Sequence, residues 1–250
     1  MKTLRITTLF FALLLFSAAL FAQSETRNVS SFDKIQVAGA FDVYLEKGDK
    51  ESVKVDPGNV DPEKIITEID GNTLKVYQEK GNYKIMNAKV YITYKSLDQI
   101  DRAGSGNLYG KSDLEAEDFT INTSGSGNLS LEGNLKGQEV ELNASGSGNC
   151  KLESVEATDF EMNLAGSGNI TVSSGTTQKQ EANVAGSGNI SAYGVKSDVC
   201  EVSITGSGDV EVYANESLEG SIAGSGNINY KGNAQVKKDG IIGSGEISKH

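Results

Sequence analysis

The chain has 250 residues, with 23 lysines and arginines against 34 aspartates and glutamates, so its formal net charge is −11. Such an acidic surface repels nucleic acid and anionic lipid, and it favours cations or basic partners. The only histidine is the terminal His250, which excludes catalytic or metal sites built from clustered histidines.

Residues 1–22 predict an export signal. Lys2 and Arg5 form a basic start, residues 9–16 are an apolar run, and small residues follow. This order is that of a secretory signal peptide, and we expect cleavage after Ala22. A transmembrane anchor is the alternative, but the run is shorter than the roughly 20 residues that span a bilayer. We therefore expect a protein of the periplasm, the outer-membrane surface or the medium, and not an integral membrane protein.

Residues 23–103 are less regular and predict an irregular capping region. Gly39-Ala40-Phe41-Asp42 is a worn copy of a motif that first appears in full at Gly104, 65 residues later. That distance leaves room for one or two unmarked coils between the two glycines. Between them, 61–63 (Asp-Pro-Glu) predicts a short helix start and 70–72 (Asp-Gly-Asn) predicts a hairpin turn before a strand.

From residue 104 onward the tetrapeptide Gly-Ser-Gly-Asn, or a close variant, recurs eight times; each copy is called a quartet here. The steps between copies are 21, 21, 20, 20, 20, 18 and 19 residues. A step of about 20 residues predicts one coil of a stacked repeat fold for each quartet. The quartets begin at Gly104, Gly125, Gly146, Gly166, Gly186, Gly206, Gly224 and Gly243.

Within each coil, apolar and polar residues alternate on both sides of the quartet, which indicates a strand, a turn and a strand. The residue after the fourth quartet position is always apolar, as at Leu129, Ile170 and Ile190. These positions predict a continuous interior when the coils stack. The glycines are expected to supply the positive φ that a reversal within four residues needs, and the asparagine to tolerate left-handed backbone and bond its own main chain.

The predicted fold is therefore all-β: a right-handed parallel β-helix, or β-solenoid, with about 20 residues per coil. We expect 23–103 to be its amino-terminal β-rich part, 104–250 its repeat part, and 28–250 one continuous domain. The register separates Cys150 from Cys200 by roughly 14 Å along the axis. A disulfide requires alpha carbons within about 7 Å, so two free, buried thiols are expected.

Residues 28–250 resemble the putative auto-transporter adhesin, head GIN domain family. The resemblance is carried by 32–35 (Phe-Asp-Lys-Ile) leading to 39–43 (Gly-Ala-Phe-Asp-Val), and by 90–94 (Val-Tyr-Ile-Thr-Tyr) with Leu97 before the first quartet. It implies an exported bacterial protein, typically of Bacteroidetes type, with a β-helical fold.

The outward positions offer few chemical groups. A row of acids stands five residues before the turn glycine: Glu141, Glu161, Glu181, Glu201 and Glu219. Its functional interpretation is a rail for divalent cations or a polycation, whereas the alternative, which we favour, is a solvated face with screened repulsion. A parallel row, Asn122, Asn143, Asn163 and Asn183, is expected to form an interlocking amide ladder.

Tyr193 and Tyr213 stand at equivalent outward positions and are weak candidates for stacking a sugar ring. No catalytic cluster, metal site or cofactor is predicted, although abundant carboxylates leave a carbohydrate-active enzyme as the least favoured alternative. The leading hypothesis is a non-enzymatic adhesin that presents solenoid faces to a glycan or protein partner. The second is a structural cell-envelope protein, a homo-oligomer assembled through the solenoid ends.

Overall fold

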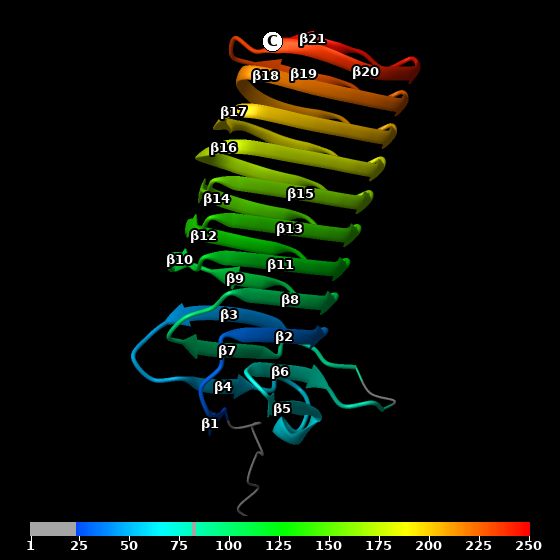
Figure 1. The fold of residues 1–250 in the computed structure, drawn as a ribbon. Coiled ribbons are helices and arrows are strands. Elements are labelled where there is room, and N and C mark those ends of the chain that lie inside the picture. The colour runs from blue at the N-terminus through cyan, green and yellow to red at the C-terminus, as the bar shows by residue number, and fades with distance from the viewer. Residues whose placement is uncertain (1–23, 82–83) are drawn as a thin grey trace, which may run out of the picture.

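The computed structural model describes residues 24–81 and 84–250 and shows an elongated β-solenoid (Figure 1). In these described residues, twenty-one strands form one continuous sheet and one short 3₁₀ helix is present. In the described part of the chain, no helix has the length and apolar character needed to cross a membrane. The signal predicted for residues 1–22 lies outside the described residues.

The first face of the solenoid consists of the strands that lead into each quartet. They pair in parallel, and the register places Gly104, Gly125 and Gly146 directly beside one another. The predicted stacking of quartets is therefore confirmed. The strands of this face are β2 (Lys34–Gly39), β8 (Gln99–Gly104), β11 (Asp118–Gly125), β13 (Glu139–Gly146), β15 (Asp159–Gly166), the second halves of β16 (Ile170–Gly186), β17 (Ile190–Gly206) and β18 (Val210–Gly224), and β20 (Gln235–Gly243).

The second face consists of the strands that leave each quartet. β16, β17 and β18 run without a break through the second corner of the coil, so each contributes to both faces. A short strand, β10 (Leu114–Glu115), pairs with the end of β12. The remaining strands of this face are β3 (Asp42–Lys47), β9 (Leu108–Gly110), β12 (Leu129–Lys136), β14 (Cys150–Glu156), β19 (Ile228–Lys231) and β21 (Ile247–Lys249).

The interior is one apolar core that runs the length of the solenoid. Leu129, Ile170 and Ile190 are each at most 1% exposed, and the register aligns them through Cys150 in adjacent coils. No single coil encloses these side chains, because each needs the coils above and below to exclude water. Burial of this shared column therefore stabilises the stacking of coil on coil.

The amino-terminal region corrects one expectation. Gly39 pairs directly with Gly104, so no coil lies between the two glycines. The intervening chain instead passes to the outer side of β2 and β3, where β6 (Thr73–Gln78) extends the first face and β7 (Lys89–Tyr94) extends the second. One unmarked coil is present, but in space it comes before the worn copy rather than after it.

Antiparallel strands complete this end of the sheet. β5 (Ile65–Asp70) forms a hairpin with β6 around Gly71, and β4 (Ser52–Asp56) pairs with β7 and with β1 (Glu25–Asn28). The hairpin and the short helix, Pro62–Lys64 with Asp61 as its N-cap, are both confirmed. The change to antiparallel pairing ends the repeat and covers the last parallel strand of each face.

The quartets turn the chain in a space that admits only glycine at two positions. The first glycine has φ between +96° and +143° in all eight quartets, so the predicted positive φ occurs at one of the two glycines. The third residue has a different constraint, because a Cβ on Gly148 would lie 1.9 Å from the carbonyl oxygen of Gly127 in the coil below. Stacking at strand spacing thus requires glycine twice in each turn.

The fourth quartet residue behaves differently from the expectation. None of these asparagines has a positive φ, and their side chains bond the next coil rather than their own main chain. Asn128 Oδ1 accepts hydrogen bonds from both the backbone nitrogen and the side-chain Nδ2 of Asn149, at 3.0 and 3.2 Å. The fourth position is therefore an inter-coil clamp, which begins at Asp42 and continues to Glu246.

The two thiols are free and buried, as predicted. Burial raises the pKa of the Cys150 thiol, and it raises the pKa of Cys200 to about 11. Cys200 lies in a buried polar cluster where Ser197 Oγ is 3.0 Å from its sulfur and 3.1 Å from Gln180 Oε1. A protonated, buried thiol is a weak nucleophile, so neither cysteine is a catalytic candidate.

Candidate binding surface

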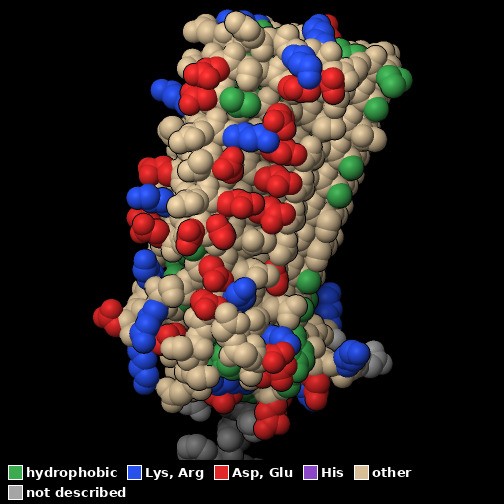
Figure 2. Space-filling view, in the orientation of Figure 1, with side chains coloured by type: hydrophobic (Ala, Val, Ile, Leu, Met, Phe, Trp, Pro, Cys, Tyr) green, Lys and Arg blue, Asp and Glu red, His purple; other side chains and the backbone are tan. Residues whose placement is uncertain are grey.

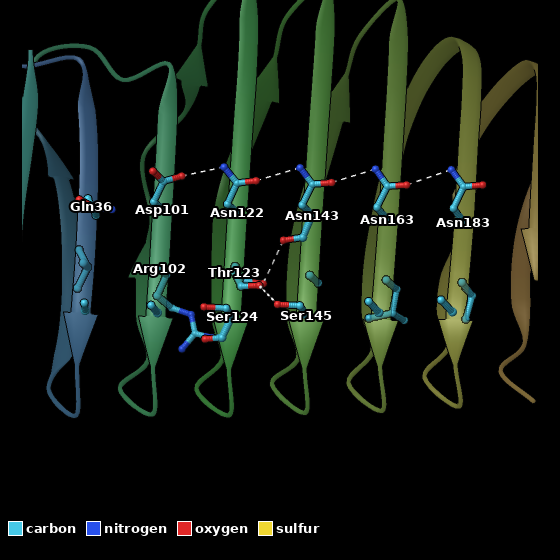
Figure 3. A pocket seen from close by; sticks show the side chains of 18 of the residues that line it. Gln36, Asp101, Arg102, Asn122, Thr123, Ser124, Asn143, Ser145, Asn163 and Asn183 are labelled. Atoms are coloured by element: carbon cyan, nitrogen blue, oxygen red, sulfur yellow. Dashed lines mark hydrogen bonds between the residues drawn. The ribbon is translucent and has the colours of Figure 1, made fainter. Parts of the chain in front are cut away.

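A groove with a volume of 780 Å³ runs along the outside of the first face (Figure 3). Its lining comes from the same three positions of β2, β8, β11, β13, β15, β16 and β17, just before the turn glycine. Seven coils at a strand spacing of about 4.8 Å make it roughly 29 Å long. We call it the asparagine groove, after the row of amides that follows it.

The amides form the ladder that the sequence predicts. Each Asn Nδ2 donates to the side-chain oxygen of the coil before it, as the dashed lines in Figure 3 show. The four bonds are Asn122 to Asp101 at 2.8 Å, Asn143 to Asn122 at 2.9 Å, Asn163 to Asn143 at 2.9 Å and Asn183 to Asn163 at 3.0 Å. The ladder gives the groove a continuous polar wall.

The floor of the groove consists of small outward-facing side chains one residue before each turn glycine. Most of these side chains are exposed. Because all of them are small, they leave the backbone beneath them open to solvent. In the last coil the column ends at Ile242, which is 76% exposed. The floor residues are Ala38, Ala103, Ser124, Ser145, Ala165, Ala185 and Thr205.

The acidic row lies beside the ladder, two residues earlier in each strand. Its five glutamates occupy adjacent coils in direct register, and acidic side chains form a band across the coils in Figure 2. Three of the ladder asparagines also donate to the glutamate of their own coil, at 2.9 Å for Glu141, 2.7 Å for Glu161 and 3.1 Å for Glu181. The ladder and the acidic row are therefore one hydrogen-bonded surface.

Lysines neutralise part of the acidic row. Lys179 Nζ lies 3.0 Å from Glu201 and Lys237 Nζ lies 2.6 Å from Glu219. The hydrogen bond to Glu201 raises the pKa of Lys179. Within residues 24–81 and 84–250, no group of three or more His, Cys, Asp or Glu side chains is placed to hold a metal ion. The contacts of Lys179 and Lys237 reduce the repulsion within the acidic row, as the solvated-face interpretation expects.

Arg102 lies beneath the amino-terminal end of the groove and is 4% exposed. Its Nη1 donates to Gly106 O at 2.9 Å and its Nη2 donates to Ser124 O at 3.1 Å, so the guanidinium holds two successive turns together. The Arg102 Nε has no hydrogen-bond partner. Burial lowers the pKa of the Arg102 guanidinium. Sequence reasoning missed this residue, although it is one of only two arginines after residue 22.

The tyrosine pair is not arranged as expected. The register shifts between Ser191 and Lys196, so Tyr213 stands opposite Lys196 and not opposite Tyr193. The Tyr193 ring is instead covered by the Lys231 ammonium, 4.3 Å from its centroid. The two rings therefore do not form a shared platform, and the equivalence of their positions is wrong.

A different aromatic row occurs on the second face, near the amino-terminal end. Tyr44 stacks between Tyr91 and Tyr109, with ring centroids 5.1 and 5.2 Å apart. The signal was present, because Tyr44 and Tyr109 both follow the fourth motif residue by two positions. The row was missed because Tyr91 belongs to the unmarked coil, whose place beside β3 the spacing does not reveal.

Comparison with known proteins places the chain in a family. It matches the family described as "Putative auto-transporter adhesin, head GIN domain" twice, over residues 31–134 and 120–234. No protein with a curated description matches it.

Three crystal structures are similar over 91% of the chain. A putative lipid binding protein from Parabacteroides distasonis is 33% identical, with 96% of its own chain covered and a TM-score of 0.82. A putative adhesin from the same organism is 26% identical, with 96% covered and a TM-score of 0.80. A putative adhesin from Parabacteroides merdae shares the fold at 24% identity, with 95% covered and a TM-score of 0.82. The chain belongs to the head GIN domain family of putative auto-transporter adhesins.

Proposed function

We propose that the protein is an exported, non-enzymatic binding protein of adhesin type that holds its glycan or protein partner in the asparagine groove. The observation that carries this proposal is the groove itself, which repeats one polar wall and one small-residue floor through seven coils. Repetition of this kind suits an elongated partner, because each coil adds the same contact.

The absence of a catalytic role is supported by the side chains. His250 is the only histidine in the sequence, and both cysteines are buried with raised pKa values. The groove wall consists mostly of amides, which neither donate nor accept protons as general acids or bases at neutral pH. Function resides in sites rather than in folds, and the side chains of this site favour binding over chemistry.

The proposal is tested by blocking the groove. Ala165→Arg places a long side chain on the exposed floor, whereas Thr171→Arg places the same side chain on the exposed second face as a matched control. Arrays of glycans, lipids and surface proteins are probed with all three chains. Binding that Ala165→Arg abolishes and Thr171→Arg retains supports the proposal. Binding that survives in Ala165→Arg, or that is absent in the wild type, contradicts it.

Lipids belong among the probes because a relative that is 33% identical is described as a putative lipid binding protein. Ala103, Ala165 and Ala185 of the groove floor are exposed apolar side chains that an acyl chain could contact from outside. A hit confined to lipid probes and lost in Ala165→Arg would retain the groove as the site and change the class of partner.

A second candidate function is structural assembly through the solenoid end. In the described residues β20 and β21 of the last coil pair on one side only, and the apolar residues Val236 and Ile241 of β20 are only partly buried. A second copy placed against this coil would cover them. Sedimentation at increasing protein concentration tests this function. Oligomers of the wild type that dissociate in the variant Ile241→Lys support this function. A wild type that is monomeric at every concentration contradicts it.

A further inference from the structure

The hydrogen-bonding capacity of the ladder is unevenly used. Asn143, Asn163 and Asn183 each give one hydrogen of Nδ2 to the preceding coil and the other to the glutamate of their own coil. A side-chain amide has two donor hydrogens. These three residues therefore have no N–H left for a ligand.

Their oxygens are not used up in the same way. An amide oxygen has two lone pairs, and the Oδ1 atoms of Asn122, Asn143 and Asn163 each accept one ladder bond. The wall therefore presents a row of neutral acceptors at the spacing of the coils. A ligand that meets this wall has to supply hydrogen-bond donors.

The negative charge of the acidic row narrows the class of partner further. The acidic row lies next to the wall and repels sulfate, phosphate or uronate groups. The oxygens that face the ligand are neutral amides, which lose their hydration at much lower cost than carboxylates do. Recognition at the wall therefore does not depend on a positive charge in the partner.

Arg102 lies beneath the groove and is not one of the groups that meet a ligand, because its side chain is buried and holds the carbonyl oxygens of Gly106 and Ser124. The ladder oxygens alone therefore set the class of partner. An ammonium donates but carries a charge, which neutral acceptors do not require, whereas a hydroxyl donates without one. Hydroxyl groups are thus the uncharged donors that match the wall.

We infer that the asparagine groove binds an uncharged glycan chain laid along the solenoid axis, with its hydroxyls donating to the Oδ1 atoms of the ladder. The exposed floor of Ala165, Ala185 and their neighbours lets the chain lie close to the backbone. This inference rests on the proposed function and names the partner for it.

The first experiment compares neutral, sulfated or uronate-bearing, and amine-bearing glycans on one array with the full exported chain. We expect binding to neutral glycans that does not change between about 0.05 and 0.5 M NaCl, because no ion pair is screened. Binding confined to charged glycans, or lost with salt, would overturn the inference. Binding confined to proteins would overturn it too, while leaving the proposed function in place.

The second experiment removes the donors of the glycan. Permethylation of a neutral glycan that binds replaces every O–H by O–CH₃ and keeps the ring and its oxygens. We expect at least a tenfold loss of affinity, which equals about 1.4 kcal/mol. Retention of full affinity would show that the wall does not recognise hydroxyl donors, and would overturn the inference. The variant Ala165→Leu is expected to abolish binding to the unmodified glycan, and Thr171→Leu to leave it unchanged.

Discussion

The repeat region, residues 104–250, and the amino-terminal region, residues 24–103, differ in how sequence order relates to spatial order. In the repeat region each coil pairs with the coil that precedes it and the coil that follows it in the chain. In the amino-terminal region the chain forms β2 and β3 and then continues on their outer side, where β6 pairs with β2. It then returns to the inner side, where β8 pairs with β2. A period in the sequence reveals neighbours only where the chain never leaves the stack.

The two regions also differ in their turns. The worn copy has Phe41 where the full quartets have their second glycine, and Phe41 is 2% exposed. Glycine is required at this position where another turn stacks below, because a Cβ on Gly106 would lie 1.9 Å from the Phe41 carbonyl oxygen. No quartet precedes Phe41 in the stack, since the segment between β6 and β7 lacks the motif. The worn copy thus marks the first coil of the repeat stack.

The largest expected effect tests this difference between turns. Gly146→Ala adds a Cβ that lies 2.4 Å from Gly125 O, at a φ of +105°. Gly71→Ala, in the amino-terminal hairpin, meets nothing within 4 Å at a φ of +62°. We expect chemical denaturation to show a loss of roughly 3 kcal/mol or more for the first and about 1 kcal/mol for the second. Equal losses would mean that stacking of the turns is not the constraint.

The next effect concerns the ladder. Asn163→Ala removes the bonds from Asn163 to Asn143 and Glu161, and it removes the acceptor of Asn183. We expect the free energy of unfolding to fall by about 1–3 kcal/mol. Gln36→Ala, in the same column but before the ladder begins, is the control and is expected to change it by less than about 0.5 kcal/mol. An Asn163→Ala variant with an unchanged free energy of unfolding would show that the ladder does not stabilise the stack.

Alkaline pH is expected to weaken both regions in different ranges. Folding raises the pKa of Cys200 from 9.0 to about 11 and that of Tyr94 from 10.0 to about 12. The unfolded chain therefore loses these protons first, so each contribution is complete below the unfolded pKa and is lost as pH rises through the folded one. The slope is at most about 1.4 kcal/mol per pH unit for each group.

Unfolding measured against pH separates the two groups. Cys200→Ala is expected to flatten the decline between pH 9 and 11, and Tyr94→Phe the decline between pH 10 and 12. The wild type and each variant serve as controls for one another. If neither variant alters the decline in its own range, burial of these two groups is not its cause.

The smallest effect concerns the acidic row, which only the repeat region possesses. Lys179→Gln removes the contacts of this ammonium with Glu181 and Glu201 and is expected to cost less than about 1 kcal/mol, because the pair is partly exposed. Calcium is expected to leave the melting temperature unchanged in both the wild type and this variant. A calcium-dependent rise in melting temperature would restore the cation-rail hypothesis.

The sequence permits prediction where one residue type serves one purpose in every coil. The turn glycines, the inward column through Leu129 and Ile190, and the ladder asparagines all repeat, so their places follow from the period alone. The short helix at Pro62 and the hairpin at Gly71 follow from local turn chemistry. These features depend on the chain within a few residues or within one step.

The features that could not be predicted depend on contacts between segments far apart in the chain. The position of β7 beside β3 and the resulting stack of Tyr91, Tyr44 and Tyr109 require the path of the insertion. The shift that separates Tyr193 from Tyr213 arises from irregular pairing between Ser191 and Lys196, which the 20-residue step conceals. The bonds of the fourth quartet asparagine to the next coil were missed because an asparagine in a turn equally suits a local bond.

The most direct test of the central claim is a disulfide between the worn copy and the first full quartet. Ala38 and Ala103 are direct neighbours in the register of β2 and β8, and adjacent strands are close enough for the bond. With Ala38→Cys and Ala103→Cys together, peptide mapping under oxidising conditions should find these two cysteines joined, whereas Ala38→Cys with Ala165→Cys should remain reduced. Failure of the first pair to join while the protein stays folded would contradict the stacking described here.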